Sequence, residues 1–116
     1  MDPTPAIVDS LDLQFAYQVV NFINDCRERL KLPIVATSGL RTLAEQQALL
    51  RAGRTTTLQS KHLKGLAVDV DLYGQSRDAV PAAVWQQIGP LGETFGLVWG
   101  GRWKSFRDVG HFESAV

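Results

Sequence analysis

Only two histidines occur in the sequence, and each lies near an aspartate and a glycine. His62 precedes Gly65 and Asp69, while His111 follows Asp108 by three positions. A turn near Gly65 would bring His62 back over a strand that presents Asp69, and His111 would complete a set of two imidazoles and one carboxylate. This is the ligand count of a catalytic zinc site with one position left for water, whose pKa such a site lowers to about 7. A metal-dependent hydrolase is therefore the leading hypothesis.

Two carboxylates compete for the role of general base at such a site. Asp108 can stand beside the metal without being a ligand, because Val109-Gly110 gives the chain flexibility before His111. Glu113 shares strand parity with His111, so it would be either the base or a group that orients the His111 ring. The competing interpretation is structural, since a lone histidine is often an ordinary packed or exposed residue and paired aspartates often only solvate a strand. Spacing alone leaves both interpretations open.

The strands that would carry these residues show a period of two. If residues 65–72 form a strand, its alternate side chains point to opposite faces. One face then carries only aliphatic side chains, those of Leu66, Val68, Val70 and Leu72. The other carries Gly65, Ala67, Asp69 and Asp71. Two carboxylates thus stand beside the smallest side chains, with space in front of them. A last strand at 109–113 places His111 and Glu113 on one face and Phe112 on the other.

The remaining patterns predict an α+β fold, a small, mainly antiparallel sheet with helices packed on one side. Apolar spacing, caps and breakers predict helices at about 10–31, 42–52 and 81–95, the last interrupted at Gly89-Pro90. Short β-branched or apolar runs predict strands at 34–37 and 97–99. Residues 1–9 are expected to be a loosely packed lead-in, and residues 54–61 a loop over the site. No linker or repeat divides the chain, so residues 1–116 are predicted to form one catalytic domain.

Local signals at the second helix place Arg41 at a strand-to-helix junction. Thr42 followed by Glu45 is a capping-box pattern, so the helix begins directly after that arginine. Gln46 is expected to be a packing or rim residue rather than part of the chemistry. Cys26 falls on the apolar face of the first helix, where a buried structural thiol is favoured over a reactive one.

Composition excludes several classes of partner. Twelve basic and twelve acidic side chains cancel, which argues against binding nucleic acid or a membrane surface through net charge. The first residues contain no secretory signal, and no apolar run is long enough to insert into a membrane, so we expect synthesis in the cytoplasm. We also expect the protein to be a monomer. A single cysteine excludes an intramolecular disulfide.

Three segments resemble peptidase family M15, the D-Ala-D-Ala metallopeptidase and L-alanyl-D-glutamate endopeptidase family. Residues 60–69, Ser-Lys-His-Leu-Lys-Gly-Leu-Ala-Val-Asp, are similar to its Ser-x-His-x-x-Gly-x-Ala-x-Asp signature. Residues 96–113 resemble the branch that includes phage endolysins and bacterial wall endopeptidases. Residues 38–42 with Glu45-Gln46 resemble the upstream element of the family. The three motifs occur in the family's order, which makes the resemblance specific.

The resemblance implies a hedgehog/D-Ala-D-Ala peptidase-like fold and a role for each matching residue. The implied ligands of one zinc ion are His62, Asp69 and His111. Asp108 matches the general base, which favours it over Glu113, and Arg41 matches an arginine that stabilises the oxyanion.

Three further residues are candidates for binding the substrate. Ser60 matches a family serine that would hydrogen-bond the substrate backbone, although it suits a loop-capping role equally well. Trp99 and Trp103 would line the groove, although aromatic residues after a strand are as often core.

The implied activity is hydrolysis of the peptidoglycan stem peptide at the L-Ala-D-Glu bond, in host lysis or wall remodelling. A phage lysin without a signal would reach the wall after permeabilisation of the membrane. The alternatives are a D-Ala-D-Ala carboxypeptidase or dipeptidase, and a catalytically silent domain that binds wall peptides.

Overall fold

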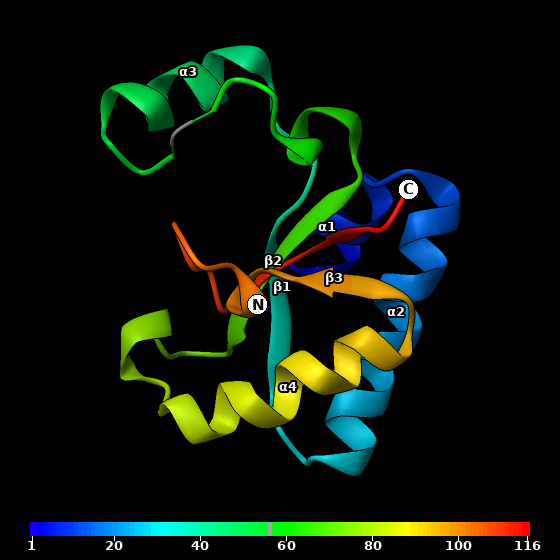
Figure 1. Ribbon diagram of the computed structural model, residues 1–116. Coiled ribbons are helices and arrows are strands. Elements are labelled where there is room, and N and C mark those ends of the chain that lie inside the picture. Colours follow the sequence, from blue (N-terminus) through cyan, green and yellow to red (C-terminus); the bar gives the residue numbers. More distant parts are fainter. Residues whose placement is uncertain (56) are drawn as a thin grey trace.

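One antiparallel sheet positions the predicted site. The computed structural model describes residues 1–55 and 57–116 (Figure 1). Its four strands lie in the order β1-β2-β4-β3. Their bounds are β1 (Ile34–Ser38), β2 (Ala67–Leu72), β4 (His111–Ser114) and β3 (Leu97–Trp99). Every pair of neighbouring strands is antiparallel, which confirms the predicted α+β class. The last strand in the sequence, β4, thus lies inside the sheet.

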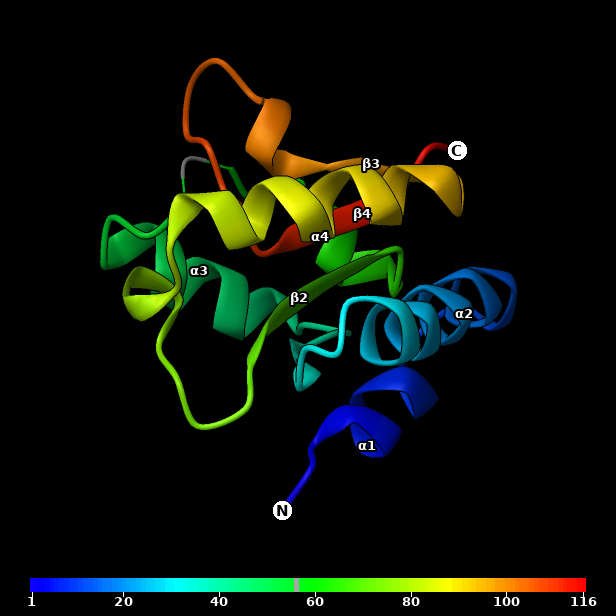
Figure 2. The ribbon, with the colours of Figure 1, turned by 90° about the horizontal axis from the view of Figure 1, so that it is seen from below.

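The core lies between the sheet and two helices, α2 (Leu13–Arg29) and α4 (Ala82–Thr94). Strand β2 contributes Val68 and Val70, which are fully buried, as the period-two pattern predicted. The rings of Phe22 from α2 and Phe112 from β4 pack with centroids 4.7 Å apart. Figure 2 shows α4 running across the sheet with α2 beside it. This packing leaves the other face of β2 and β4, with its carboxylates, free for the site.

The N-terminal residues are ordered against the sheet, so the predicted loose lead-in is wrong. Residues Thr4–Asp9 form helix α1, and the Thr4 side chain is buried. Its hydroxyl accepts a hydrogen bond of 3.0 Å from the backbone N–H of Ala36. Because β1 is an edge strand, that N–H would otherwise lack a partner in the sheet. An ion pair of 3.0 Å between Asp2 and Arg27 further fixes the segment.

Helix α4 is continuous, so the predicted interruption at Gly89-Pro90 is also wrong. A proline inside a helix removes one hydrogen bond and costs about 3 kcal/mol in isolation. Here the helix buries Trp85 and Ile88 on its inner face, which offsets that cost. A Cβ at position 89 would lie 2.3 Å from the Trp99 ring. The glycine therefore serves close packing rather than helix termination.

The third helix lies away from this core. Helix α3 (Leu43–Arg51) begins with the predicted capping box between Thr42 and Glu45. Figures 1 and 2 both show it at the opposite side of the molecule from α2. The described part of the chain also contains three short 3₁₀ helices, η1 (Lys61–Lys64), η2 (Arg77–Ala79) and η3 (Gly100–Arg102). Across residues 1–55 and 57–116, no helix has the length and apolar character needed to span a bilayer.

Candidate active site

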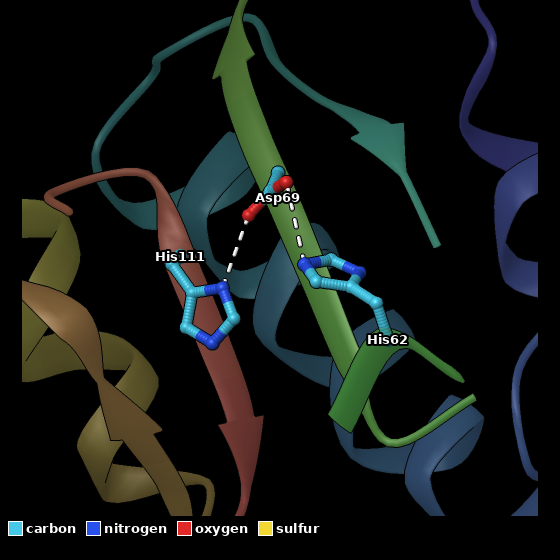
Figure 3. A group of neighbouring side chains, drawn as sticks. All are labelled: His62, Asp69 and His111. Carbon is cyan, nitrogen blue, oxygen red and sulfur yellow. Dashed lines mark hydrogen bonds and ion pairs between the residues drawn. The ribbon is translucent and has the colours of Figure 1, made fainter. Parts of the chain in front are cut away.

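The predicted metal ligands meet on the face of the sheet that the core leaves free (Figure 3). Asp69 and His111 are paired residues on the neighbouring strands β2 and β4. His62 comes from η1, which turns into β2 through Gly65 in a left-handed conformation. The Nε2 atom of His62 lies 3.4 Å from Oδ2 of Asp69, and Nδ1 of His111 lies 3.2 Å from Oδ1. All three potential ligand atoms lie within 4.8 Å of one another.

Each histidine is oriented by a partner on its outer nitrogen. Nδ1 of His62 lies 2.8 Å from the carbonyl oxygen of Gly39, and Nε2 of His111 lies 2.9 Å from Oε1 of Glu113. A proton on each outer nitrogen leaves the inner nitrogen, which faces Asp69, able to donate a lone pair. Metal-binding histidines are held in this way in most proteins. The set therefore fits a divalent cation such as zinc, and the position of Glu113 matches the orienting role considered for it.

The cluster concentrates charge in a buried place. Burial would raise the pKa of Asp69, but hydrogen bonds with His111 and His62 hold that pKa far below its usual range. Burial would lower the pKa of His111, but its contacts with Asp69 and Glu113 raise the pKa to about 9. Asp69 therefore stays charged and draws positive charge toward it, from a proton on His111 and from the Arg41 guanidinium. A divalent cation bound by these side chains would take the place of the His111 proton, because a coordinating imidazole is neutral.

An open cleft of about 1180 Å³ borders the cluster. Its walls come from α3, from residues 76–78 and from the segment that leads into β4. Residues 54, 55, 57, 59 and 60 also line it, and they belong to the stretch 54–61 that was expected to form a loop over the site. In Figure 1 these segments all project to the same side of the sheet. A peptide of several residues can enter a cleft of this size and reach the cluster.

Arg41 lies beside the cluster, at the junction of β1 and α3. Its guanidinium Nη2 lies 3.5 Å from Oδ2 of Asp69, and its backbone N–H donates to the carbonyl of His62 at 2.9 Å. Its Nη1 donates to Oε1 of Gln46 at 2.8 Å, and the Gln46 amide donates to the carbonyl of Thr57 at 2.7 Å. Gln46 is fully buried, so it does more than line a rim. The sequence signal for the contact between Gln46 and Arg41 was that both residues belong to the upstream motif.

Asp108 also lines the cleft, and its carbonyl accepts a hydrogen bond of 3.2 Å from the backbone N–H of His111. Its side chain pairs with Arg77, the first residue of η2, which belongs to no sequence motif and was not among the predicted site residues. Arg77 also contacts Asp71, whose role the sequence left unassigned. Burial would lower the pKa of Arg77, but Asp108 and Asp71 raise it, so the guanidinium stays charged.

Ser60 and Trp103 both line the cleft. The Ser60 hydroxyl oxygen accepts a hydrogen bond of 3.2 Å from the backbone N–H of His62, so the capping role considered for it is present. The Trp103 ring packs against the His111 ring, with centroids 4.9 Å apart. Both side chains are therefore placed where they can also contact a substrate.

Trp99 is in a different position, which corrects the expectation that it lines the groove. Only 1% of its surface is exposed, its indole N–H donates to the carbonyl of Val109 at 2.8 Å, and its ring packs on Gly89. It lies at the end of β3 with its side chain toward the core. Trp99 supports the segment that carries Asp108 and does not contact the cleft.

Comparison with known proteins gives one family match. Residues 53–114, more than half of the chain, match the family model Peptidase_M15_4, described as D-alanyl-D-alanine carboxypeptidase. The chain is also 29% identical over 101 residues to the peptidoglycan L-alanyl-D-glutamate endopeptidase CwlK of Bacillus subtilis. That match covers 71% of this chain and 60% of CwlK, so the chain spans about three fifths of the length of this relative.

Solved structures share the fold. The L-Ala D-Glu endopeptidase ChiX of Serratia marcescens matches with a TM-score of 0.76 and 26% identity over 97% of this chain and 86% of ChiX. The vancomycin resistance D,D-pentapeptidase VanY from a VanB-type cassette, solved with Zn(II), matches with a TM-score of 0.70 and 16% identity over 91% of this chain and 73% of VanY. VanYB with D-alanine-D-alanine matches with a TM-score of 0.66 and 18% identity over 91% of this chain and 72% of VanYB.

Proposed function

We propose, because the chain belongs to the M15 family of peptidases, that residues 1–116 form one zinc-dependent catalytic domain that cuts the peptidoglycan stem peptide at the L-Ala-D-Glu bond. The observation that carries the proposal is the geometry of His62, Asp69 and His111, whose potential ligand atoms lie within 4.8 Å of one another beside a large cleft. The choice of bond is supported by the two relatives named as L-Ala-D-Glu endopeptidases, CwlK and ChiX.

In this mechanism each candidate site residue has a separate role. Bound zinc would supply a Lewis acid that polarises the scissile carbonyl and lowers the pKa of water. Asp108 takes a proton from the attacking water and returns it to the leaving amine, a role that typically contributes 10²- to 10⁴-fold. Arg41 donates hydrogen bonds to the oxyanion, where removal of one donor typically costs about 10²- to 10³-fold in turnover. Ser60 and Trp103, which both line the cleft, contact the peptide.

The setting of the reaction is the cell wall. Basic and acidic side chains balance in these 116 residues, which argues against retention by anionic wall polymers through net charge. We expect a monomer, and in an endolysin role the chain would reach its substrate after the membrane has been permeabilised.

Mass spectrometry of purified muropeptides tests the scissile bond. Incubation with the zinc-loaded protein should release a peptide that begins at D-Glu. Chelation should abolish the release, and added zinc should restore it. Loss of the terminal D-Ala alone would refute the proposed bond, and protein that never binds stoichiometric zinc would refute the proposed centre.

A D-Ala-D-Ala carboxypeptidase is the second candidate. The description of the matching family model favours it, and VanY and VanYB share the fold. The same muropeptide assay separates the two activities, because they release different products.

A catalytically silent domain that binds wall peptides is the remaining alternative. Asp108→Ala separates it from both hydrolases. A hydrolase should lose turnover while it retains zinc and binds the peptide, whereas a binding domain should be unaffected and should show no turnover before the substitution.

A further inference from the structure

Arg77 joins two carboxylates that come from different parts of the fold. It begins η2, and its side chain reaches back over the sheet. Nη1 donates to Oδ1 of Asp108 at 2.5 Å, and Nε lies 3.3 Å from Oδ1 of Asp71 on β2. Nη2 lies 3.5 Å from the carbonyl oxygen of Val70. All three nitrogens of the guanidinium are therefore directed to fixed acceptors, a geometry that a lysine cannot reproduce.

The backbone beneath the guanidinium is shaped to accept it. A Cβ at Gly110 would lie 2.5 Å from both Cζ and Nε of Arg77. The carbonyl of Gly110 also accepts a hydrogen bond of 2.8 Å from the N–H of Val70, which fixes this backbone to β2. Any larger residue before His111 would therefore displace the arginine. The glycine and the arginine form one structural unit.

This unit controls the direction of the Asp108 carboxylate. The Asp108 backbone is held by its N–H, which donates to the carbonyl of Gly100 at 3.1 Å, and by its own carbonyl, which accepts from His111. Within residues 1–55 and 57–116, Arg77 is the one side chain that hydrogen-bonds the carboxylate. Its contact engages Oδ1 and leaves Oδ2 available to accept a proton.

We propose that Arg77 is a positioning residue that fixes the Asp108 carboxylate at the cleft, with Asp71 holding the arginine and Gly110 providing its space. This inference rests on the proposed function, in which Asp108 is the base. It assigns a role to Asp71 and explains the glycine that precedes His111.

A positioning role and a purely structural ion pair predict different effects when the Arg77 side chain is removed. Side chains of Arg77 and Asp108 are 30% and 34% exposed, and pairs of such exposure contribute little to stability. Misplacing a catalytic group by about 1 Å, in contrast, costs roughly 10²-fold in rate. Removal of Arg77 should therefore change turnover far more than the stability of the fold.

The primary test is the turnover of Arg77→Ala in the full chain with zinc bound, measured on muropeptides. We expect kcat to fall roughly 10- to 100-fold with KM and zinc content unchanged. Added guanidinium ions, below denaturing concentrations, should restore part of the activity, and Arg77→Lys should retain part of it. The matched control is Arg102→Ala, which removes a two-point arginine pair with Glu93 outside the cleft and should leave kcat unchanged.

A second variant disturbs the contact between Arg77 and Asp108 through the backbone beneath the guanidinium. Gly110→Ala should displace the guanidinium and lower kcat similarly while zinc remains bound. Guanidinium ions should not rescue it, because the added methyl group occupies their place. Normal kcat in Gly110→Ala would overturn the inference.

A double-mutant cycle with Asp108→Asn separates this inference from the proposed function. If Arg77 acts only through Asp108, Arg77→Ala should cost nothing further in the Asp108→Asn background. An equal loss in both backgrounds, or no loss in the parent protein, would overturn the positioning role while leaving the proposed base intact. Full turnover in Asp108→Asn alone would instead overturn the assignment of the base, and the inference with it.

Discussion

The contact between Glu113 and His111 yields a quantitative prediction for zinc affinity. Oε1 of Glu113 lies 2.9 Å from Nε2 of His111, and Oε2 lies 3.3 Å from Nζ of Lys61. Its hydrogen bond with His111 lowers the pKa of Glu113, so the side chain is a charged acceptor between two donors. Glu113→Gln keeps the shape of the side chain but supplies only one acceptor oxygen.

Neither orientation of the introduced amide satisfies both neighbours. With its oxygen toward His111, its NH₂ group faces the Lys61 ammonium, and the reverse orientation sets NH₂ against the imidazole N–H. Removing such an outer partner typically weakens a metal site by about 10- to 100-fold. This corresponds to roughly 1.4–2.8 kcal/mol of binding free energy. Glu113→Gln should fall near the lower end of this range, and Glu113→Ala, which removes the acceptor entirely, near the upper end.

Competition for zinc against a chromophoric chelator measures this loss at fixed pH and ionic strength. Glu93→Gln is the matched control, because Glu93 pairs with Arg102 away from the cleft. Circular dichroism should show that all variants remain folded. Wild-type zinc affinity in Glu113→Gln, or an equal loss in Glu93→Gln, would refute the argument that Glu113 orients the His111 ring.

Three further predictions concern the fold. Thr42→Ala removes half of the capping box of α3 and should lower the free energy of unfolding by about 1 kcal/mol in urea titration; an unchanged midpoint would contradict the role of the cap. Gly89→Ala places a methyl group against the Trp99 ring and should cost about 1–3 kcal/mol in the same assay, where a neutral result would show that α4 can move. Burial raises the pKa of the Cys26 thiol to about 11, so iodoacetamide at neutral pH should alkylate it only after denaturant is added, as judged by mass spectrometry, and rapid alkylation of folded protein would count against this packing.

Sequence patterns predicted the parts of the fold that depend on local rules. The alternation along β2 separated Val68 and Val70 from Asp69, and the capping box located the start of α3. The errors came from tertiary contacts that local rules do not contain. Helix α1 is held against an edge strand by the hydrogen bond from Ala36 to Thr4, and α4 continues through Pro90 with its inner face buried.

The candidate site was likewise predictable in part, and the residues that were missed depend on tertiary contacts. Spacing and residue type suggested His62, Asp69 and His111 as one ligand set, and the resemblance supported that set. The structure brings the three together, although no periodicity in the sequence pairs β2 with β4. Arg77 was not predictable, because its partners are defined only when η2 folds back over the sheet. Trp99 and Trp103 could not be separated by residue type, since the direction of each side chain depends on where β3 ends.

The place of β4 in the sheet has a consequence for the order of folding. This strand is the last in the sequence, yet it lies between β2 and β3, so β3 joins the sheet only through it. The same strand carries His111. Pairings between such distant segments form slowly, because the chain entropy lost in closing the loop must be overcome first. A chain whose final strand has not docked therefore has neither a continuous sheet nor a complete ligand set, and hydrolytic competence should arise in the same cooperative step that completes the fold.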